Sequence, residues 1–333
     1  MTDAKSPPLA PNSGSALSTL MRSDFALVVP AFNEADVVPD LVKELREAWS
    51  THGLSGEIIL VDDGSTDGTA EIAEGEAEGW DLFKVVRHRK NLGKTEGMVT
   101  AAAATERTYL VLFDADLQHH PDEIPRFLAK LGEGWDIVTG RKVGAYDKRA
   151  VSSVYNKMSR KIFDVPVTDL NSMKAFRREI LDGLALRHDW HRFFVVLAHA
   201  RGYTVAEIDI ELLPRRAGTS KFQGPLRILI GVMDLLSVWF LLLFSRKPLL
   251  LFGASGMALS GLGVLVATVA VYLRFMHPML GFDPYIPPLG YRLWLYLVML
   301  LETLGFLLVG FGLVSEQVAQ VRQELDEIRK RMR

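Results

Sequence analysis

Several features are missing from this sequence, and each absence removes a class of function. The 333 residues include no cysteine, which excludes disulfide bonds, thiolate metal sites and a cysteine nucleophile. The formal net charge is −2, so the chain lacks the basic excess typical of nucleic-acid binding, and no nucleic-acid partner is expected. Residues 1–23 are rich in Ser, Pro and Ala and lack the apolar run of a signal peptide. We expect a disordered tail here and an N-terminus in the cytoplasm.

Long apolar runs are also absent from residues 24–223. Short β-rich runs alternate there with helical stretches, which predicts an α/β domain with a mostly parallel sheet. In such sheets the ligand binds at the carboxyl ends of the strands. The predicted strands are 25–29, 58–61, 83–86, 109–113 and 137–139, and the clearest predicted helices are 36–52 and 94–104.

The last third of the chain is much more apolar. Residues 249–273 carry no charge, and at ~1.5 Å per residue a helix of this length can cross a bilayer core of ~30 Å. A second span is predicted at 293–314, so 248–314 would form a transmembrane hairpin. For residues 224–247 we favour an amphipathic helix in the membrane interface over a third span. Glu302, inside the second span, is expected to lie near the interface or to pair between helices rather than to act in the chemistry.

Basic residues are distributed unevenly around the predicted spans. The loop between them carries Arg274 and Arg292, whereas Arg246 and Lys247 precede the hairpin and five further basic residues follow it. The positive-inside rule therefore predicts a multi-pass protein of the plasma (inner) membrane with its catalytic domain and both ends in the cytoplasm. Residues 315–333 form a charged helix with apolar residues spaced 4, 3, 4, 3, which is typical of a short coiled coil, so a homo-oligomer is a hypothesis.

Polar clusters follow the predicted strands. The first strand leads into PAFNE at 30–34, and the second ends in Asp62 and Asp63 before a turn that caps a helix. By itself, the second cluster is equally compatible with an ordinary strand–turn–helix joint. The third cluster, NLGK at 91–94, has a glycine that would let the backbone approach a phosphate, although such a short loop is weak evidence alone.

The fourth cluster, DADLQHH at 114–120, contains two carboxylates one residue apart at the end of a strand. Like charges this close are unfavourable unless a cation lies between them. Asp114 and Asp116 can face the same side of an extended segment and hold one Mg²⁺ or Mn²⁺, with Gln118 as a neutral ligand. Adjacent His119 and His120 point in different directions and have no third strong ligand at useful spacing, which argues against zinc.

In combination, these motifs resemble the family 2 glycosyltransferases of the GT-A (Rossmann-like) fold. VVPAFNE, VDDGSTDGT, NLGK and DADLQHHPDEIP occur in that order, and the likeness covers residues 24–222. TDLNSMKAFRRE (168–179) and PRRAGTSK (214–221) are similar to segments of dolichyl-phosphate mannose synthase and the bacterial polyprenyl-phosphate glycosyltransferases. Met173 and Lys174 depart from the expected glycine–phenylalanine-like pair, which puts the sugar contacts there in doubt.

The resemblance implies a role for each matching position. Asp116, Arg141 and Arg215 would be catalytic, and Asp114, Asp116 and Gln118 would hold the metal. Nucleotide-sugar binding is implied for Pro30, Phe32, Glu34, Asp62, Asp63, Lys94, Asp114, Ala115, Asp116 and Gln118. Binding of the acceptor phosphate is implied for Arg141, Arg149, Ser153, Arg215 and Lys221, with Arg215 and Arg216 hard to distinguish.

The expected reaction is an inverting, metal-dependent transfer of one sugar from a nucleoside diphosphate, of the GDP-mannose or UDP-glucose type, to polyprenyl phosphate (dolichyl or undecaprenyl phosphate). A lipid phosphate is already anionic and needs cations to position it rather than a base. The alternatives are a membrane glycosyltransferase acting on another lipid or glycan hydroxyl, and a non-catalytic membrane scaffold.

Overall fold

The computed structural model of this chain describes residues 22–143, 165, 167–170, 172–184, 186, 190–214, 233, 236–240, 248–276, 279–281 and 288–331. It divides into two compact units, Met1–Val232 and Met233–Arg333. Residues 1–21 of the predicted tail and most of the predicted interfacial helix lie outside the described residues. So do four of the predicted site residues, Arg149, Ser153, Arg215 and Lys221.

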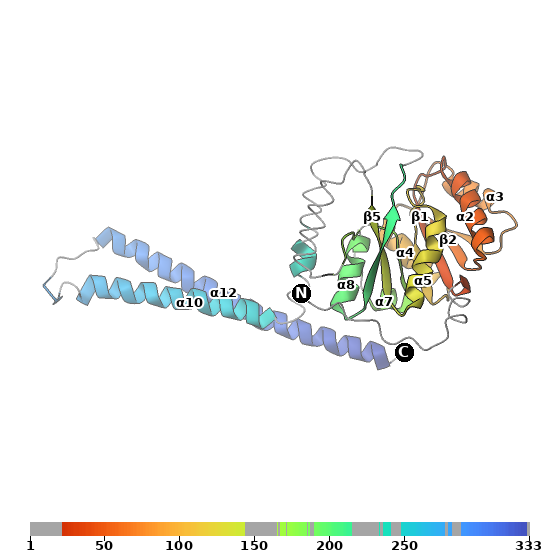
Figure 1. Cartoon of the computed structure of the whole chain (residues 1–333). Helices are drawn as coiled ribbons and strands as arrows, with labels where there is room; N and C mark the ends of the chain where they lie inside the picture. The colour runs from red at the N-terminus through yellow and green to blue at the C-terminus, as the bar shows by residue number, and fades with distance from the viewer. Residues whose placement is uncertain are drawn as a thin grey trace. The chain divides into compact units, whose positions relative to one another are not determined.

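The first unit is built on one seven-stranded sheet with the order β3-β2-β1-β4-β6-β5-β7 (Figure 1). All neighbouring strands are parallel except β6, which is antiparallel to both β4 and β5. The predicted α/β domain with a mostly parallel sheet is therefore confirmed. The strands are β1 (Phe25–Ala31), β2 (Glu57–Asp62), β3 (Phe83–Arg87), β4 (Tyr109–Leu112), β5 (Ile137–Val143), β6 (Lys174–Arg177) and β7 (Val205–Glu211).

Helices cover both faces of this sheet. Phe25, Leu27 and Val29 of β1 belong to one buried cluster with Leu41 and Leu45, which lie on the apolar stripe of α2. α5 packs on the same core, and α4, with η2 and α8, covers the opposite face. The helices of this unit are α2 (Val38–His52), α3 (Thr69–Glu76), α4 (Lys94–Ala103), η1 (Pro121–Glu123), α5 (Ile124–Gly132), α7 (Arg178–Gly183), η2 (Trp190–Phe193) and α8 (Phe194–Ala200).

The second unit contains two long apolar helices. α10 (Pro248–Val271) continues into a π-helical turn, η3 (Tyr272–Met276), and α12 (Pro288–Arg331) returns alongside it. By length and composition, Pro248–Met276 and Arg292–Val321 are candidate membrane spans, as the sequence predicts. Only 17% and 11% of their apolar windows are buried, so both helices expose apolar surface as a membrane-embedded pair would.

Small residues bring these two helices together. A Cβ atom on Gly256 of α10 would lie 2.6 Å from the carbonyl oxygen of Gly305 of α12, so no larger residue fits there. Gly263 lies against the Glu302 carboxylate in the same way, and Glu302 Oε1 is buried without a hydrogen-bond partner. Glu302 thus faces α10, and in the described residues no side chain of the neighbouring helix pairs with its Oε1.

Candidate active site

The loops after β1 and β2 are tied together by hydrogen bonds between side chains and backbone. The backbone N–H of Asn33 donates to Ser65 Oγ (2.8 Å), and Asn33 Oδ1 accepts from the N–H of Thr66 (2.9 Å). The N–H of Glu34 donates to Thr69 Oγ1 (2.9 Å) at the start of α3. These bonds fix the PAFNE segment, which contains the predicted nucleotide-binding residues Pro30, Phe32 and Glu34, against the second predicted cluster.

Asp63 joins the second cluster to the third. Its carboxylate accepts hydrogen bonds from the N–H groups of Leu92 (2.8 Å) and Gly93 (2.7 Å) and contacts His88 Nδ1 (2.8 Å). The carboxylate is buried, and both oxygens bind protein groups. Asp63 therefore holds the NLGK loop in place, and His88, which sequence reasoning missed, completes the joint through Thr100 Oγ1 (2.9 Å). The carboxylate of Asp62, also buried, accepts a hydrogen bond from Ser65 N–H (3.2 Å) and from no other group among the described residues.

The third and fourth clusters meet at an ion pair. The ammonium of Lys94, the first residue of α4, contacts Asp114 Oδ1 directly after β4. Burial opposes ionisation of Asp114, but the Lys94 cation and its hydrogen bond outweigh this and hold the pKa of the carboxyl well below its usual range. All four predicted clusters are thus connected at one edge of the sheet.

Backbone strain is concentrated at the same edge. Among the described residues, Asn33 (φ 52°) and Leu117 (φ 51°) are the non-glycine residues with a left-handed φ. They follow β1 and β4, which are the neighbouring strands where the strand order reverses. Open α/β sheets bind ligands at this switch point, and strained residues persist where the surrounding structure enforces them. The edge between β1 and β4 is therefore the candidate site.

Asp116 and Gln118 follow Asp114 in this strained segment. Asp116 is 8% exposed and its Oδ1 accepts from Gln118 N–H (3.2 Å), whereas Asp114 and Gln118 are partly exposed; Ala115 between the two aspartates is buried. His119 is buried as well, and its Nδ1 has no hydrogen-bond partner. Burial lowers the pKa of His119, with the charge of Asp114 opposing, so its imidazole is held neutral beside the two carboxylates.

These donors fit a divalent cation that is shared with a substrate. Within the described residues, no three His, Asp or Glu side chains are grouped so as to hold a metal by themselves. Mg²⁺ commonly uses one or two carboxylates and takes its remaining ligands from substrate phosphates and water. Asp114 and Asp116, with the amide oxygen of Gln118, supply a donor set of that kind.

Further lysines lie around Asp114. Lys174 of β6 is 1% exposed, and its Nζ donates to the carbonyl oxygen of Leu170 at a long 3.4 Å. Lys142 of β5 pairs with Asp169 (3.5 Å). Burial, together with the Lys94 cation, lowers the pKa of Lys174 to about 7. We call Lys94, Lys142 and Lys174 the lysine cluster; these cations lie among the carboxylates of the site, where they can offset the charge of a bound anion.

Other predicted residues lie elsewhere. Arg141 forms a two-pronged ion pair with Asp209 of β7, through Nε–Oδ1 (2.5 Å) and Nη2–Oδ2 (2.8 Å). In the described part of the chain, the hydrogen bonds of Arg141 are to Asp209 and not to the Asp114 cluster, and its predicted catalytic and acceptor roles remain predictions. His191 of η2, in contrast, comes close to the site: its N–H donates to Thr95 Oγ1 (3.1 Å), beside Lys94. Burial lowers the pKa of His191 well below its usual value.

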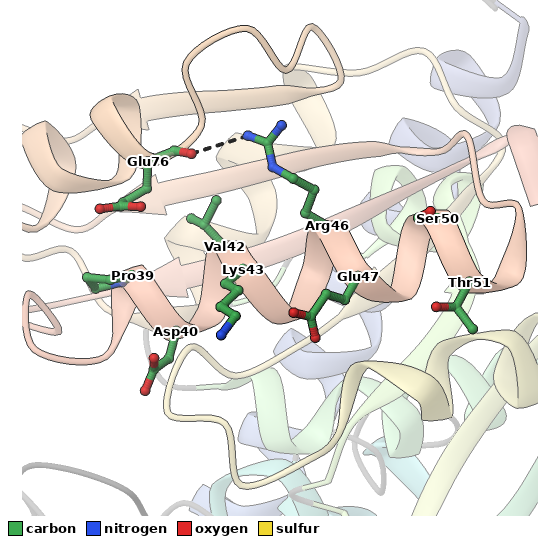
Figure 2. Close-up of a pocket in the computed structure, with 9 residues that line it drawn as sticks. All are labelled: Pro39, Asp40, Val42, Lys43, Arg46, Glu47, Ser50, Thr51 and Glu76. Atoms are coloured by element: carbon green, nitrogen blue, oxygen red, sulfur yellow. Dashed lines mark hydrogen bonds between the residues drawn. The ribbon is translucent and has the colours of Figure 1, made fainter.

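A separate hollow lies on the outer side of α2. It has a volume of about 640 Å³ and is lined by charges of both signs, including Lys43, Arg46 and Glu47 (Figure 2). The guanidinium of Arg46 donates a hydrogen bond to the backbone oxygen of Glu76 (3.2 Å; Figure 2) and lies over the ring of Trp80. None of the residues from the four clusters lines this hollow, so it is a surface feature apart from the candidate site.

Comparison with known proteins agrees with the geometry. A family model described as "Glycosyl transferase family 2" matches residues 26–195, from β1 to the beginning of α8. The chain belongs to glycosyltransferase family 2. It is therefore a glycosyltransferase, and the matched region contains all four clusters.

Two relatives in this family carry the same activity name. The chain is 28% identical over 306 residues to undecaprenyl-phosphate 4-deoxy-4-formamido-L-arabinose transferase of Klebsiella pneumoniae, covering 90% of this chain and 89% of that protein. It is 30% identical over 254 residues to the transferase of that name from Pseudomonas fluorescens, covering 75% and 73%. The first alignment, over 306 residues, is longer than the first unit, Met1–Val232, so it includes part of the second unit.

Solved structures support the fold. Glucosyl-3-phosphoglycerate synthase from Mycobacterium tuberculosis, in complex with Mn²⁺, UDP and its product, matches with a TM-score of 0.52 and 21% identity, covering 68% of this chain and 88% of that one. Its UDP complex matches with a TM-score of 0.54 and 22% identity, covering 70% and 88%. At this identity the likeness establishes the GT-A type of fold.

Proposed function

We propose that the protein transfers one sugar from a nucleoside diphosphate sugar to a polyprenyl phosphate at the cytoplasmic face of the membrane. The observation that carries the proposal is the position of Asp114 and Asp116 at the switch point of a family 2 domain whose chain continues into two membrane-length helices. The relatives' names support the acceptor, because they specify undecaprenyl phosphate. The proposed domain arrangement is that of the sequence prediction, with 24–223 catalytic, 224–247 interfacial, 248–314 spanning and 315–333 cytoplasmic.

In the proposed reaction, an oxygen of the lipid phosphate attacks the anomeric carbon, the bond from that carbon to the diphosphate breaks, and the nucleoside diphosphate leaves with the bonding electrons. The configuration inverts in this single displacement. The nucleophile is already an anion, so the site must neutralise charge and align the groups rather than remove a proton. Lys94 and Lys174, whose charges interact with Asp114, are proposed to contribute to this, and Arg215 and Lys221 are proposed to hold the acceptor phosphate.

Asp114, Asp116 and Gln118 would hold Mg²⁺ or Mn²⁺. Bound there, the ion would offset the charge on the departing nucleoside diphosphate. Asp62 is proposed to contact the nucleotide directly, since within the described residues its carboxylate accepts a single hydrogen bond, from Ser65 N–H. Asp63, whose oxygens bind the NLGK loop, is proposed to shape the nucleotide pocket instead of touching the nucleotide.

The first experiment is a donor screen with the full-length protein, polyprenyl phosphate and Mg²⁺ or Mn²⁺. The panel should contain UDP- and GDP-linked hexoses and a nucleotide-linked 4-deoxy-4-formamido-L-arabinose, because the donor sugar and nucleotide remain open. We expect lipid-linked sugar from one donor, and a loss of at least about tenfold in Asp116→Asn and Arg215→Ala. Lys43→Met, on the far side of α2, is the matched control and should retain activity.

Other outcomes would contradict parts of the proposal. Nucleotide release without lipid-linked sugar would support the donor site and reject the acceptor. Activity on a diacylglycerol or glycan hydroxyl, with none on polyprenyl phosphate, would favour the alternative glycosyltransferase. Failure to bind any donor in the presence of either metal would contradict the proposed enzyme altogether.

A further inference from the structure

The C-terminal part of α12 exposes an apolar stripe where it is otherwise polar. Val314, Val318, Val321, Leu325 and Ile328 are between 50% and 61% exposed, at spacings of four and three. From 315 to 331, every residue outside this stripe except Ala319 is polar or charged. A polar helix that keeps one regular apolar line exposed has a surface suited to another helix.

The stripe is not the surface that packs on α10. Gly305 and Gly312 of α12 face α10, which crosses them at Gly256 and Gly253. The N–H of Leu249, near the beginning of α10, donates to Glu316 (3.3 Å), so α12 extends beyond the beginning of its partner helix (Figure 1). Within the second unit as described, the stripe after Glu316 therefore has no covering helix.

The same heptad continues back into the apolar part of α12. Leu304, Leu307 and Phe311 keep the spacing of three and four and are 43%, 50% and 60% exposed. The exposed line is thus continuous from the candidate span into the polar C-terminal segment of a single helix. Within the candidate span, which ends at Val321, an exposed apolar side chain is ordinary, because lipid covers it. Leu325 and Ile328 lie beyond the span, where lipid no longer covers them.

We propose that this stripe is the contact surface for further copies of the same chain, in a parallel and in-register coiled coil. The inference rests on the membrane insertion in the proposed function, because copies inserted in one orientation bring their α12 helices together in parallel. In the heptad, Val314, Val321 and Ile328 take position d, and Val318 and Leu325 take position a.

The charges beside the stripe agree with the parallel arrangement. Glu324 takes position g and Arg329, five residues later, takes position e. In a parallel coiled coil, position g of one helix pairs with the following position e of its neighbour, which brings these opposite charges together. An antiparallel pair would instead bring e positions to e positions, and two of the three, Arg322 and Arg329, are basic, with Ser315 the third. Leu325 at a with Ile328 at d favours more than two helices.

The absence of cysteine allows a direct test in the full-length protein. Single cysteines at Val321→Cys and Leu325→Cys lie on the stripe, and Gln320→Cys, at position c and also exposed, is the matched control. On mild oxidation in membranes, we expect disulfide-linked dimers from the stripe positions, several-fold above the control. Equal yields from all three positions, or none from the stripe, would overturn the proposal.

A charge exchange tests the parallel register. In the Val321→Cys background, Glu324→Arg and Arg329→Glu should each lower the disulfide yield, because each brings like charges together. The double exchange should restore the yield. If it does not, the parallel register is wrong. Activity is measured on every variant in parallel, so active, membrane-embedded protein without cross-linking would reject the coiled coil alone, and inactive cross-linked protein would reject the proposed reaction alone.

Discussion

At the scale of single residues, Lys174 is the least expected part of the site. The ammonium group of a lysine that is 1% exposed has lost its hydration, and one long hydrogen bond to the carbonyl oxygen of Leu170 does not compensate for that loss. The consequence is a pKa lowered to about 7 by burial and by Lys94. Such a cation is retained near Asp114 at a cost in stability, and a bound anion would reduce that cost.

This cost should depend on pH. Below about pH 7, Lys174 is charged in both the folded and the unfolded chain, and the full penalty for burying the charge is present. Between about pH 7 and the ordinary lysine pKa of 10.5, only the unfolded chain keeps the proton on Lys174. The free energy of unfolding should therefore rise with pH over this range, by up to about 1.4 kcal/mol per pH unit. Lys174→Met should remove this contribution, making the variant's advantage largest below pH 7.

The measurement is urea unfolding of the full-length protein across this pH range, followed by tryptophan fluorescence. The exposed Lys43→Met is the control and should have the pH profile of the wild type. Parallel profiles for Lys174→Met and the wild type would show that the buried lysine does not titrate as the structure indicates.

At the residue level, a sequence can indicate a site where the signal is local. Asp114 and Asp116 are recognisable because both carboxylates and the preceding strand lie within a few residues of one another. His88 and Lys174 are not recognisable in this way, since their partners, Asp63 and Asp114, are 25 and 60 residues away. Asp63 shows what a sequence motif leaves out. The motif predicts that Asp63 lies near the nucleotide, but not that both of its carboxylate oxygens accept hydrogen bonds from the NLGK loop.

At the scale of elements, the predicted strands are continuous runs of residues that favour β structure. The two strands that the sequence analysis missed, β6 and β7, are not such runs. β6 has only four residues, two of them basic, which is not the run of β-forming residues that predicts a strand. β7 alternates apolar and acidic residues. This alternation is the pattern of a strand with one buried and one exposed face, so the sequence does contain a signal for β7.

The contact between α10 and α12 gives a prediction at this scale. A Cβ atom on Gly305 would lie 2.8 Å from the carbonyl oxygen of Gly256 and would also meet Ser260 Oγ, so Gly305→Val should separate the helices. We expect a loss of about 1–3 kcal/mol, seen as a lower temperature of aggregation in detergent. Gly310→Val is the matched control, because a Cβ atom on Gly310 meets nothing within 4 Å. An equal loss in both variants would mean that the close contact does not stabilise the hairpin.

At the scale of the whole molecule, the chain's lack of cysteine also allows its orientation in the membrane to be measured. The basic residues that flank the hairpin outnumber the two in the segment between the spans, which predicts that the catalytic unit and the C-terminal helix share the cytoplasmic side. Ser50→Cys on the exposed side of α2 reports on the catalytic unit (Figure 2), and Met279→Cys, at a side chain 81% exposed between the two spans, reports on the loop.

In intact cells, a membrane-impermeant maleimide should label Met279→Cys and leave Ser50→Cys unlabelled, and after permeabilisation it should label both. The donor of the proposed reaction is a nucleotide sugar, a soluble anion that does not cross the bilayer, so we expect Asp114 and Asp116 to face the compartment that contains it. Labelling of Ser50→Cys in intact cells would place the donor site outside and contradict the cytoplasmic reaction. Labelling of neither position in intact cells, with both accessible after lysis, would mean that residues 277–287 do not cross the membrane and that the two apolar helices are not a spanning hairpin.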